Sequence, residues 1–271
     1  MNKITTERLT LLPLTEKYLG TVHEYASDLE NTRYMCHLPS ETEEETLDFL
    51  RRAGAEWEKE KPSFYEFAVI SEGEHIGAVS VYLDDTKTTG ELGWIINKKY
   101  WGRGFAAEAA AAVIGFARKL GVRRFTAHCD TENGASYRTM ETLGMKRIGE
   151  HTGRRNRCSD EERCEYEYGL TLPEKVRITA VRSSRYDDLI EKYENPIEHA
   201  CDISVGDEFY TDGERPAGLC PEAWGVMAPF IKALLSGGGN FFNGWMKDPY
   251  SAMVSCNDGF RPVSFYIEAV Y

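Results

Sequence analysis

Two glycines, Gly102 and Gly104, stand directly before a long alanine-rich segment in the middle of the chain. Glycine has no Cβ, so the backbone at these positions can come close to a ligand. If the segment after Gly104 is helical, its first N–H groups are free and point back at the glycines. Free N–H groups and the positive end of the helix dipole suit a phosphate or pyrophosphate. The stretch therefore predicts an anion site at the start of a helix.

This site requires a strand before the glycines and a helix after them, and the surrounding pattern supplies both. Alternating and apolar runs predict strands over 6–14, 64–70, 75–83, 90–97, 123–129, 145–151 and 164–172. Helical periodicity and terminal signals predict helices over 16–26, 42–59, 106–120 and 132–143. Gly121 and Gly144 follow the last two helices, in the position that glycine commonly takes after a helix.

Length and composition limit the classes of protein. With 271 residues, one large or two unequal domains are expected. The net charge of −12 argues against binding to nucleic acid or to an anionic membrane. No apolar run approaches about 18 residues, and the start lacks a secretory pattern. Seven irregularly spaced cysteines predict free thiols and, with the other features, a cytoplasmic protein.

The pattern changes at Leu172-Pro173-Glu174, where a new strand begins. We predict a domain boundary there, with one domain over 1–172 and a second over 173–271. The second has strand-like ends at 176–181 and 263–270 and one helix over 221–235. It is expected to be a small α+β unit.

Two ligand classes fit a strand, a glycine turn and a helix. The run from Gly102 to Ala107 is formally G-x-G-x-x-A, and Asp130 ends the next strand, as in a dinucleotide-binding fold. That fold needs the strand to run directly into the first glycine, near the start of a domain. Here Lys98-Lys99-Tyr100-Trp101 intervenes and several strands come first, so a dinucleotide is disfavoured.

The other ligand is coenzyme A. Lys99-Tyr100-Trp101-Gly102-Arg103-Gly104 resembles the Q/R-x-x-G-x-G/A pyrophosphate loop of the GNAT superfamily of acetyl-CoA-dependent acyltransferases. Other motifs of its ribosomal-protein N-acetyltransferase-like branch occur in the same order: Thr6-Glu7-Arg8-Leu9-Thr10-Leu11, Gly90-Glu91-Leu92-Gly93-Trp94, and Asn133-Gly134-Ala135-Ser136 leading to Leu143-Gly144-Met145. The resemblance covers about residues 1–170. It implies an α+β fold, with a mixed, mostly antiparallel twisted sheet flanked by helices.

The resemblance also implies roles for individual residues. Backbone amides of Gly102, Arg103, Gly104, Phe105, Ala106 and Ala107 would hold the pyrophosphate of acetyl-CoA. Trp94, Ile95 and Ile96 would pair with the pantetheine arm as if it were an added strand. Asn133 and Ser136 would lie near the pantetheine and its thiol. Lys99 stands where Gln or Arg is commoner, which keeps the charge of Arg but loses its planar bidentate geometry.

The implied reaction is acetyl transfer to a primary amine, either a protein N-terminus or a small molecule. It requires deprotonation of the ammonium, polarisation of the thioester carbonyl and protonation of the leaving thiolate. Glu91 is the first candidate base, directly or through water, with Glu150 and His151 as alternatives. Ser136 is the candidate donor to the carbonyl or thiolate, because Met140 stands where many relatives have a tyrosine acid.

The motifs contain no cysteine with an identifiable base, so direct attack by the amine is expected. The acidic chain favours a cationic acceptor. An alternative is a catalytically weak module that binds acyl-CoA for regulation. The assembly is left open between a monomer and a homodimer.

The tail resembles a small domain family with the motif C-N-D-G-[LF]-R-P-V, here Cys256-Asn257-Asp258-Gly259-Phe260-Arg261-Pro262-Val263. The resemblance implies no activity. Cys201, Cys220 and Cys256, with His199, could be metal ligands, but packing is favoured and no metal is predicted. The aromatic side chains of the tail are expected to form its core: Trp224, Phe230, Phe241, Phe242 and Trp245.

Overall fold

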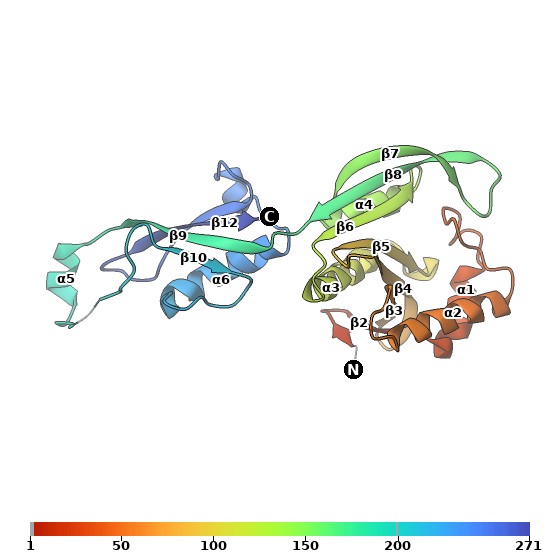
Figure 1. The fold of residues 1–271 in the computed structure, drawn as a ribbon, viewed down its shortest axis with the longest axis horizontal. Coiled ribbons are helices and arrows are strands. Elements are labelled where there is room, and N and C mark those ends of the chain that lie inside the picture. Colours follow the sequence, from red (N-terminus) through yellow and green to blue (C-terminus); the bar gives the residue numbers. More distant parts are fainter. Residues whose placement is uncertain (1–2, 199) are drawn as a thin grey trace. The chain divides into compact units, whose positions relative to one another are not determined.

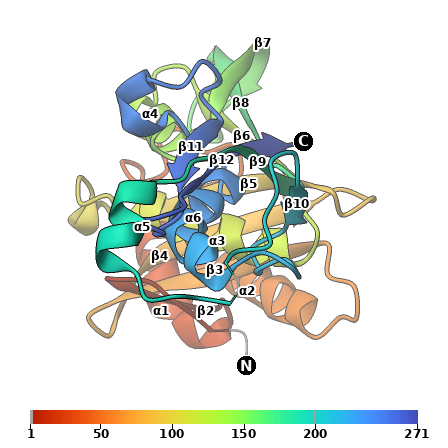
Figure 2. The ribbon, with the colours of Figure 1, turned by 90° about the vertical axis from the view of Figure 1, so that its left-hand side faces the viewer.

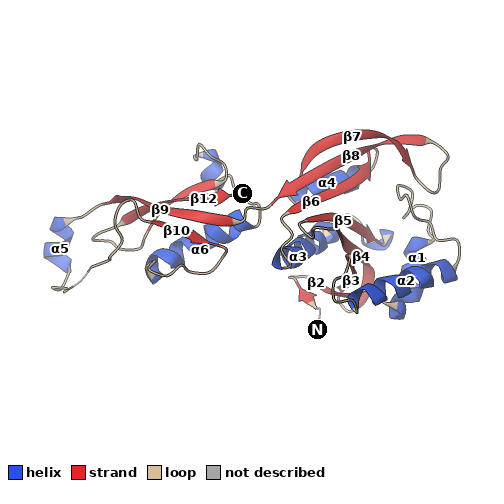
Figure 3. Cartoon of the chain, in the orientation of Figure 1, coloured by secondary structure: helices blue, strands red, loops and turns tan. Residues whose placement is uncertain are grey.

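The computed structural model describes residues 3–198 and 200–271. The chain forms two compact units, Met1–Leu170 and Thr171–Tyr271. Each unit has its own sheet and its own helices (Figure 3). The two units are described separately below.

The first unit contains an eight-stranded sheet in the order β1-β2-β3-β4-β5-β6-β8-β7 (Figure 1). The pairs β1–β2, β2–β3, β3–β4, β4–β5 and β7–β8 are antiparallel, whereas β5 and β6 are parallel. This confirms the predicted mixed, mostly antiparallel sheet. The strands are β1 (Ile4–Thr5), β2 (Leu9–Pro13), β3 (Phe64–Ser71), β4 (Glu74–Leu83), β5 (Thr89–Ile96), β6 (Arg124–Asp130), β7 (Lys146–Arg155) and β8 (Glu162–Thr171).

Helices cover both faces of this sheet. One face packs against η1 (Glu16–Tyr18), α1 (Leu19–Ala26) and α2 (Glu43–Trp57), with Tyr25 and Leu50 buried against Ala68 and Ala78. Thr42 caps α2 by accepting a hydrogen bond from the Glu45 N–H. The opposite face packs against α3 (Phe105–Lys119), and α4 (Gly134–Thr142) contacts both α3 and β6. Figure 1 shows α3 and the α1–α2 pair on opposite sides of β3, β4 and β5.

The second unit is a four-stranded antiparallel sheet, β10-β9-β12-β11, with a helix packed on it (Figures 1 and 2). Its elements are β9 (Lys175–Ser183), α5 (Asp187–Tyr193), β10 (Glu208–Thr211), α6 (Pro221–Leu235), η3 (Phe241–Gly244), β11 (Ser251–Ser255) and β12 (Val263–Val270). Met227 and Ile231 of α6 are buried against Ile178, Phe265 and Ile267 of the sheet. The predicted α+β character is confirmed.

One expectation for the second unit is wrong. Trp245 is 82% exposed and Phe242 is 38% exposed, so neither belongs to the core. The aliphatic residues of α6 and the sheet close the core, and Trp224, Phe230 and Phe241 pack only at its border. Aromatic side chains at Phe242 and Trp245 therefore did not indicate that these residues are buried.

All seven cysteines are free thiols. Within residues 3–198 and 200–271, no group of three or more His, Cys, Asp or Glu side chains is arranged to hold a metal ion. His199, one of the considered ligands, lies outside the described residues. None of the described helices is long and apolar enough to cross a membrane.

Candidate active site

The glycine turn has the geometry expected of an anion site. Gly102 and Gly104 have φ values of +75° and +77°, which side-chain-bearing residues rarely adopt. Gly104 is the N-cap residue of α3 and makes no side-chain cap to the first turn. A Cβ added at Gly102 would meet nothing within 4 Å, so the space beside the turn is open. These features fit a pyrophosphate held by the backbone amides of residues 102–107.

The N-terminal Thr-Glu-Arg motif braces this turn from a hundred residues away. The Arg8 guanidinium donates to the Arg103 carbonyl oxygen at 2.9 Å and to the Glu108 carboxylate at 2.7 Å. The Thr6 hydroxyl donates to the same carboxylate at 2.6 Å. Burial alone would raise the pKa of Glu108, but these hydrogen bonds and the Arg8 charge outweigh it and hold the pKa below its usual value. The motif therefore fixes both the turn and the first turn of α3.

The two central strands separate beside the turn. β5 and β6 pair in parallel only over Thr89–Glu91 and Arg124–Thr126. β5 continues to Ile96 on its other edge, where it remains paired with β4. Within the described structure, the edge of β5 that faces β6 therefore has no strand partner over residues 92–96. An extended polar chain can add to such an edge. Trp94, Ile95 and Ile96, the residues that the resemblance assigns to the pantetheine, lie on this stretch of β5.

Lys99 lies in η2 (Lys98–Tyr100), between β5 and the glycine turn. Its ammonium forms an ion pair with Glu24 of α1 at 2.5 Å, and the Lys99 side chain is 66% exposed. The hydrogen bond between the two side chains is the main cause that lowers the pKa of Glu24, and it also raises the pKa of Lys99. In this arrangement Lys99 links the turn to α1. Its predicted contact with the cofactor requires the ammonium to leave Glu24.

Asn133 and Ser136 lie at the start of α4. The Asn133 side chain caps this helix by accepting a hydrogen bond from the Ser136 N–H at 3.2 Å. The Ser136 hydroxyl interacts with the Cys129 thiol on β6, a residue that sequence reasoning did not select. Burial raises the pKa of Cys129 to about 11. Cys129 is therefore a neutral thiol near neutral pH, and a poor nucleophile.

Glu91 lies at the point where β5 and β6 separate. It is the last β5 residue paired with β6, opposite Thr126, and it lies opposite Tyr82 of β4. Directly opposed residues share a face of a sheet. Tyr82 shares its face with Phe64, and this face also carries Ala68 and Ala78, which pack against α1 and α2. The exposed Glu91 carboxylate therefore lies on the α1–α2 face of the sheet.

The alternative bases, Glu150 and His151, lie far from Glu91 in the sheet. Glu150 and His151 are exposed residues of β7, the edge strand, and β6 and β8 lie between β7 and β5. Neighbouring strands are about 4.8 Å apart, so these side chains belong to a different part of the sheet. His151 forms a 2.8 Å contact with Glu167. This separation favours Glu91.

Asp130 also has a structural role rather than a ligand-binding one. It is fully buried and accepts hydrogen bonds from the Arg163 guanidinium, the Asn156 amide and the Glu132 N–H. Burial would raise the pKa of Asp130, but these partners hold it below its usual value. A carboxylate in this position is not available to a ribose, which removes the basis for the dinucleotide alternative.

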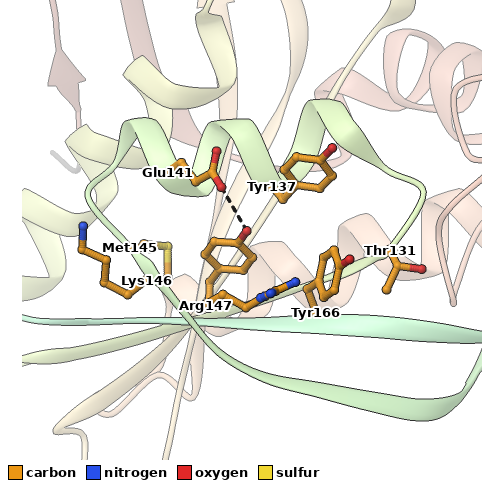
Figure 4. Close-up of a pocket in the computed structure, with 8 residues that line it drawn as sticks. Thr131, Tyr137, Glu141, Met145, Lys146, Arg147 and Tyr166 are labelled. Atoms are coloured by element: carbon orange, nitrogen blue, oxygen red, sulfur yellow. Dashed lines mark hydrogen bonds between the residues drawn. The ribbon is translucent and has the colours of Figure 1, made fainter.

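A cavity of about 600 Å³ lies between α4 and the β7–β8 pair (Figure 4). Tyr137 and Glu141 of α4 face Arg147 and Tyr166 of the strands across it. None of the residues predicted to bind the cofactor lines this cavity. The predicted site is instead the glycine turn together with the separated strands.

Comparisons with known proteins match most of the first unit to acetyltransferases. A family model described as an acetyltransferase (GNAT) domain matches residues 8–146. The uncharacterized N-acetyltransferase YnaD of Bacillus subtilis (strain 168) is 34% identical over 152 residues, which are 54% of this chain and 84% of YnaD.

Solved structures of similar fold include a GNAT-family acetyltransferase from Bacillus anthracis. It is 31% identical with a TM-score of 0.54, over 62% of this chain and 98% of that chain. RimL, a ribosomal L7/L12 alpha-N-protein acetyltransferase solved with coenzyme A, is 16% identical with a TM-score of 0.56, over 63% of this chain and 98% of that chain. At that identity RimL shows a shared fold alone.

The fold and the site define an acyltransferase that uses coenzyme A. The chain belongs to the GNAT family of acetyltransferases, and its co-substrate is acetyl-CoA.

Proposed function

We propose that this acetyltransferase transfers the acetyl group to a primary amine by direct attack on the thioester. The separation of β5 and β6 beside the braced glycine turn carries the proposal. The opening lets an acyl donor bound at the α3 side of the sheet meet an acceptor on the α1–α2 face. Glu91 lies at its end, on the acceptor face.

The residues supply the parts that the reaction needs. One proton of the ammonium passes to Glu91, directly or through water. The amine nitrogen then bonds to the carbonyl carbon and the carbon–sulfur bond breaks. The second proton leaves the nitrogen and the sulfur gains one, with Ser136 as the hydrogen-bond donor at that end. The raised pKa of Cys129 supports direct attack over an acetyl-cysteine intermediate.

The acceptor is proposed to be cationic, either a basic protein N-terminus or a small amine. The net charge of −12 and the Glu91 carboxylate on the acceptor face both attract a cation. We further propose that residues 1–172 form the transferase domain and residues 173–271 an accessory domain of the C-N-D-G-[LF]-R-P-V family.

Two measurements test the proposal. Acetyl-CoA should raise the melting temperature, and Gly104→Glu should abolish that rise because its carboxylate occupies the pyrophosphate site. Release of free thiol should then be followed with a panel of amines and N-terminal peptides. Thiol release that depends on none of these amines would refute amine acetylation, and a binding module would then explain a retained thermal shift.

Glu91→Gln tests the assignment of the base. Loss of a general base typically lowers kcat by about 10²–10⁴-fold. The melting-temperature rise with acetyl-CoA should remain, because Glu91 lies outside the glycine turn. An unchanged kcat would show that a group other than Glu91 accepts the proton.

A further inference from the structure

His128 is a residue of β6 that no motif singled out, yet it lies beside the opening between the strands. Thr126 is the last β6 residue paired with β5, and it shares a face with Glu91. Side chains alternate along a strand with a period of two. His128 therefore lies on the same acceptor face as Glu91 and Thr126, one step beyond the end of the pairing.

One carboxylate, that of Glu165, lies against the His128 ring, and an arginine holds that carboxylate. Its Nδ1 lies 3.3 Å from the Glu165 Oε1 atom on β8. The other Glu165 oxygen, Oε2, accepts from Arg154 of β7 at 2.5 Å, and Arg154 also donates to the Tyr34 carbonyl oxygen at 2.7 Å. The Cys36 thiol, in the segment between α1 and α2, lies near both Arg154 and Glu165. The segment between the two helices and β7 thus hold Glu165 in place beside the ring.

This arrangement orients the imidazole for proton transfer. Nδ1 is buried and has no well-aligned hydrogen bond within the described structure, and the Glu165 carboxylate lies 3.3 Å from it. Such contacts are often long without substrate and shorten when it binds. An Nδ1–H that points to the carboxylate leaves the Nε2 lone pair to accept a proton. Imidazole is also a stronger base than a carboxylate.

We propose that His128, oriented by Glu165, takes the first proton from the acceptor ammonium. The inference rests on the proposed amine acetylation, and it replaces Glu91 by His128 as the acceptor of this proton. The Glu91 carboxylate then attracts the cation, so Glu91→Gln should lower kcat less than His128→Ala does. The neutral amine then bonds to the carbonyl carbon. As the carbon–sulfur bond breaks, the nitrogen loses its second proton and the sulfur gains one. His128 returns its proton to solvent.

The second His–Glu pair provides a matched control. His151 and Glu167 make a 2.8 Å contact, but they lie on the edge strand β7 and its neighbour. His128→Ala should lower kcat by about 10²–10⁴-fold, with the KM for acetyl-CoA unchanged, whereas His151→Ala should retain nearly the wild-type rate. Added imidazole should restore part of the His128→Ala rate, because the His128 side chain is 28% exposed. A purely structural role would not respond to imidazole.

A second readout is the basicity of the acceptor. An α-amine has a pKa near 7.7–8.0 and a lysine-like amine one near 10.4. The loss in His128→Ala should therefore be smaller for an α-amine, of which about half or more is already deprotonated at pH 8. Glu165→Gln, a positioning variant, should lower kcat by less than His128→Ala does while the KM for acetyl-CoA stays constant.

The outcomes separate the two proposals. If the wild-type enzyme acetylates no amine, the proposed function fails and this inference falls with it. If the wild type is active but His128→Ala stays within threefold of it, or loses no more than His151→Ala, the inference is wrong. If His128→Ala is misfolded and shows no thermal shift with acetyl-CoA, the kcat of Glu165→Gln tests the inference in its place. An unchanged kcat in a folded Glu165→Gln would then overturn the inference.

Discussion

The buried carboxyl of Glu66 predicts a pH dependence of stability that can be tested in detail. Glu66 lies on β3 and is only 6% exposed. Burial raises its pKa from 4.5 to about 7, although hydrogen bonds from Tyr82 and Ser80 partly oppose this. The Tyr82 hydroxyl donates to the carboxyl at 2.7 Å. The neutral acid is therefore the form that the folded protein prefers.

The direction of the effect follows from linkage. Because the folded-state pKa is raised, the stabilisation by the protonated carboxyl is complete below pH 4.5 and is lost as the pH rises through about 7. Each unit of pKa difference corresponds to about 1.4 kcal/mol, so the total is about 3 kcal/mol. Glu66→Gln has no such dependence. Its free energy of unfolding should gain about 2–3 kcal/mol relative to wild type between pH 5 and pH 8.

Urea unfolding of the full chain at pH 5, 6, 7 and 8 measures this difference. Tryptophan fluorescence is a suitable probe, because the Trp57 indole donates to the Glu66 carbonyl oxygen at 3.0 Å. Glu91→Gln, at an exposed position on the same face, is the matched control for replacing a carboxylate by an amide. Tyr82→Phe should move the transition to higher pH, since it removes a hydrogen bond to the charged form. A difference for Glu66→Gln that is constant to within about 0.5 kcal/mol would refute the reasoning.

Two further predictions concern ion pairs that hold the site. Glu108→Gln weakens the contact with Arg8 and should lower the free energy of unfolding by about 1–2 kcal/mol. The value is at the low end for a charged hydrogen bond because the Arg8 side chain is 46% exposed. The variant should also bind acetyl-CoA more weakly. Thermal unfolding with and without acetyl-CoA checks this, with the exposed Glu7→Gln as control, and equal behaviour of the two variants would contradict it. Arg163→Met leaves the buried Asp130 charge without its cation. It should lower the free energy of unfolding, measured with urea at pH 7, by about 3 kcal/mol. Because the pKa of Asp130 is lowered, its stabilisation is present above the unfolded-state pKa and is lost as the pH falls through the folded-state value. Arg163→Met should therefore lose less stability on acidification than wild type, and a cost below 1 kcal/mol at pH 7 would rule out this role.

The features that sequence alone predicted are local ones. The glycine turn at Gly102 and Gly104 was predicted, and the helix predicted over 106–120 is observed at Phe105–Lys119, because both follow from residues adjacent in the chain. The helix Pro221–Leu235 and the strand Val263–Val270 were likewise predicted at the observed bounds. Periodicity and glycine positions act over one or two turns, so they can be interpreted without the fold. The order of several such motifs was sufficient for the family.

The tertiary structure decided which distant residues meet. Arg8 reaches Glu108 across a hundred positions, and Asp130 is buried against Arg163 on another strand. His128 gained its significance only from the point where β5 and β6 stop pairing, and Glu165 joined it from β8. Exposure of Trp245 likewise depended on which side chains closed the core of the second unit. Register and packing are long-range properties, set by how whole strands and helices fit together, and a single residue's neighbours in sequence carry no record of them.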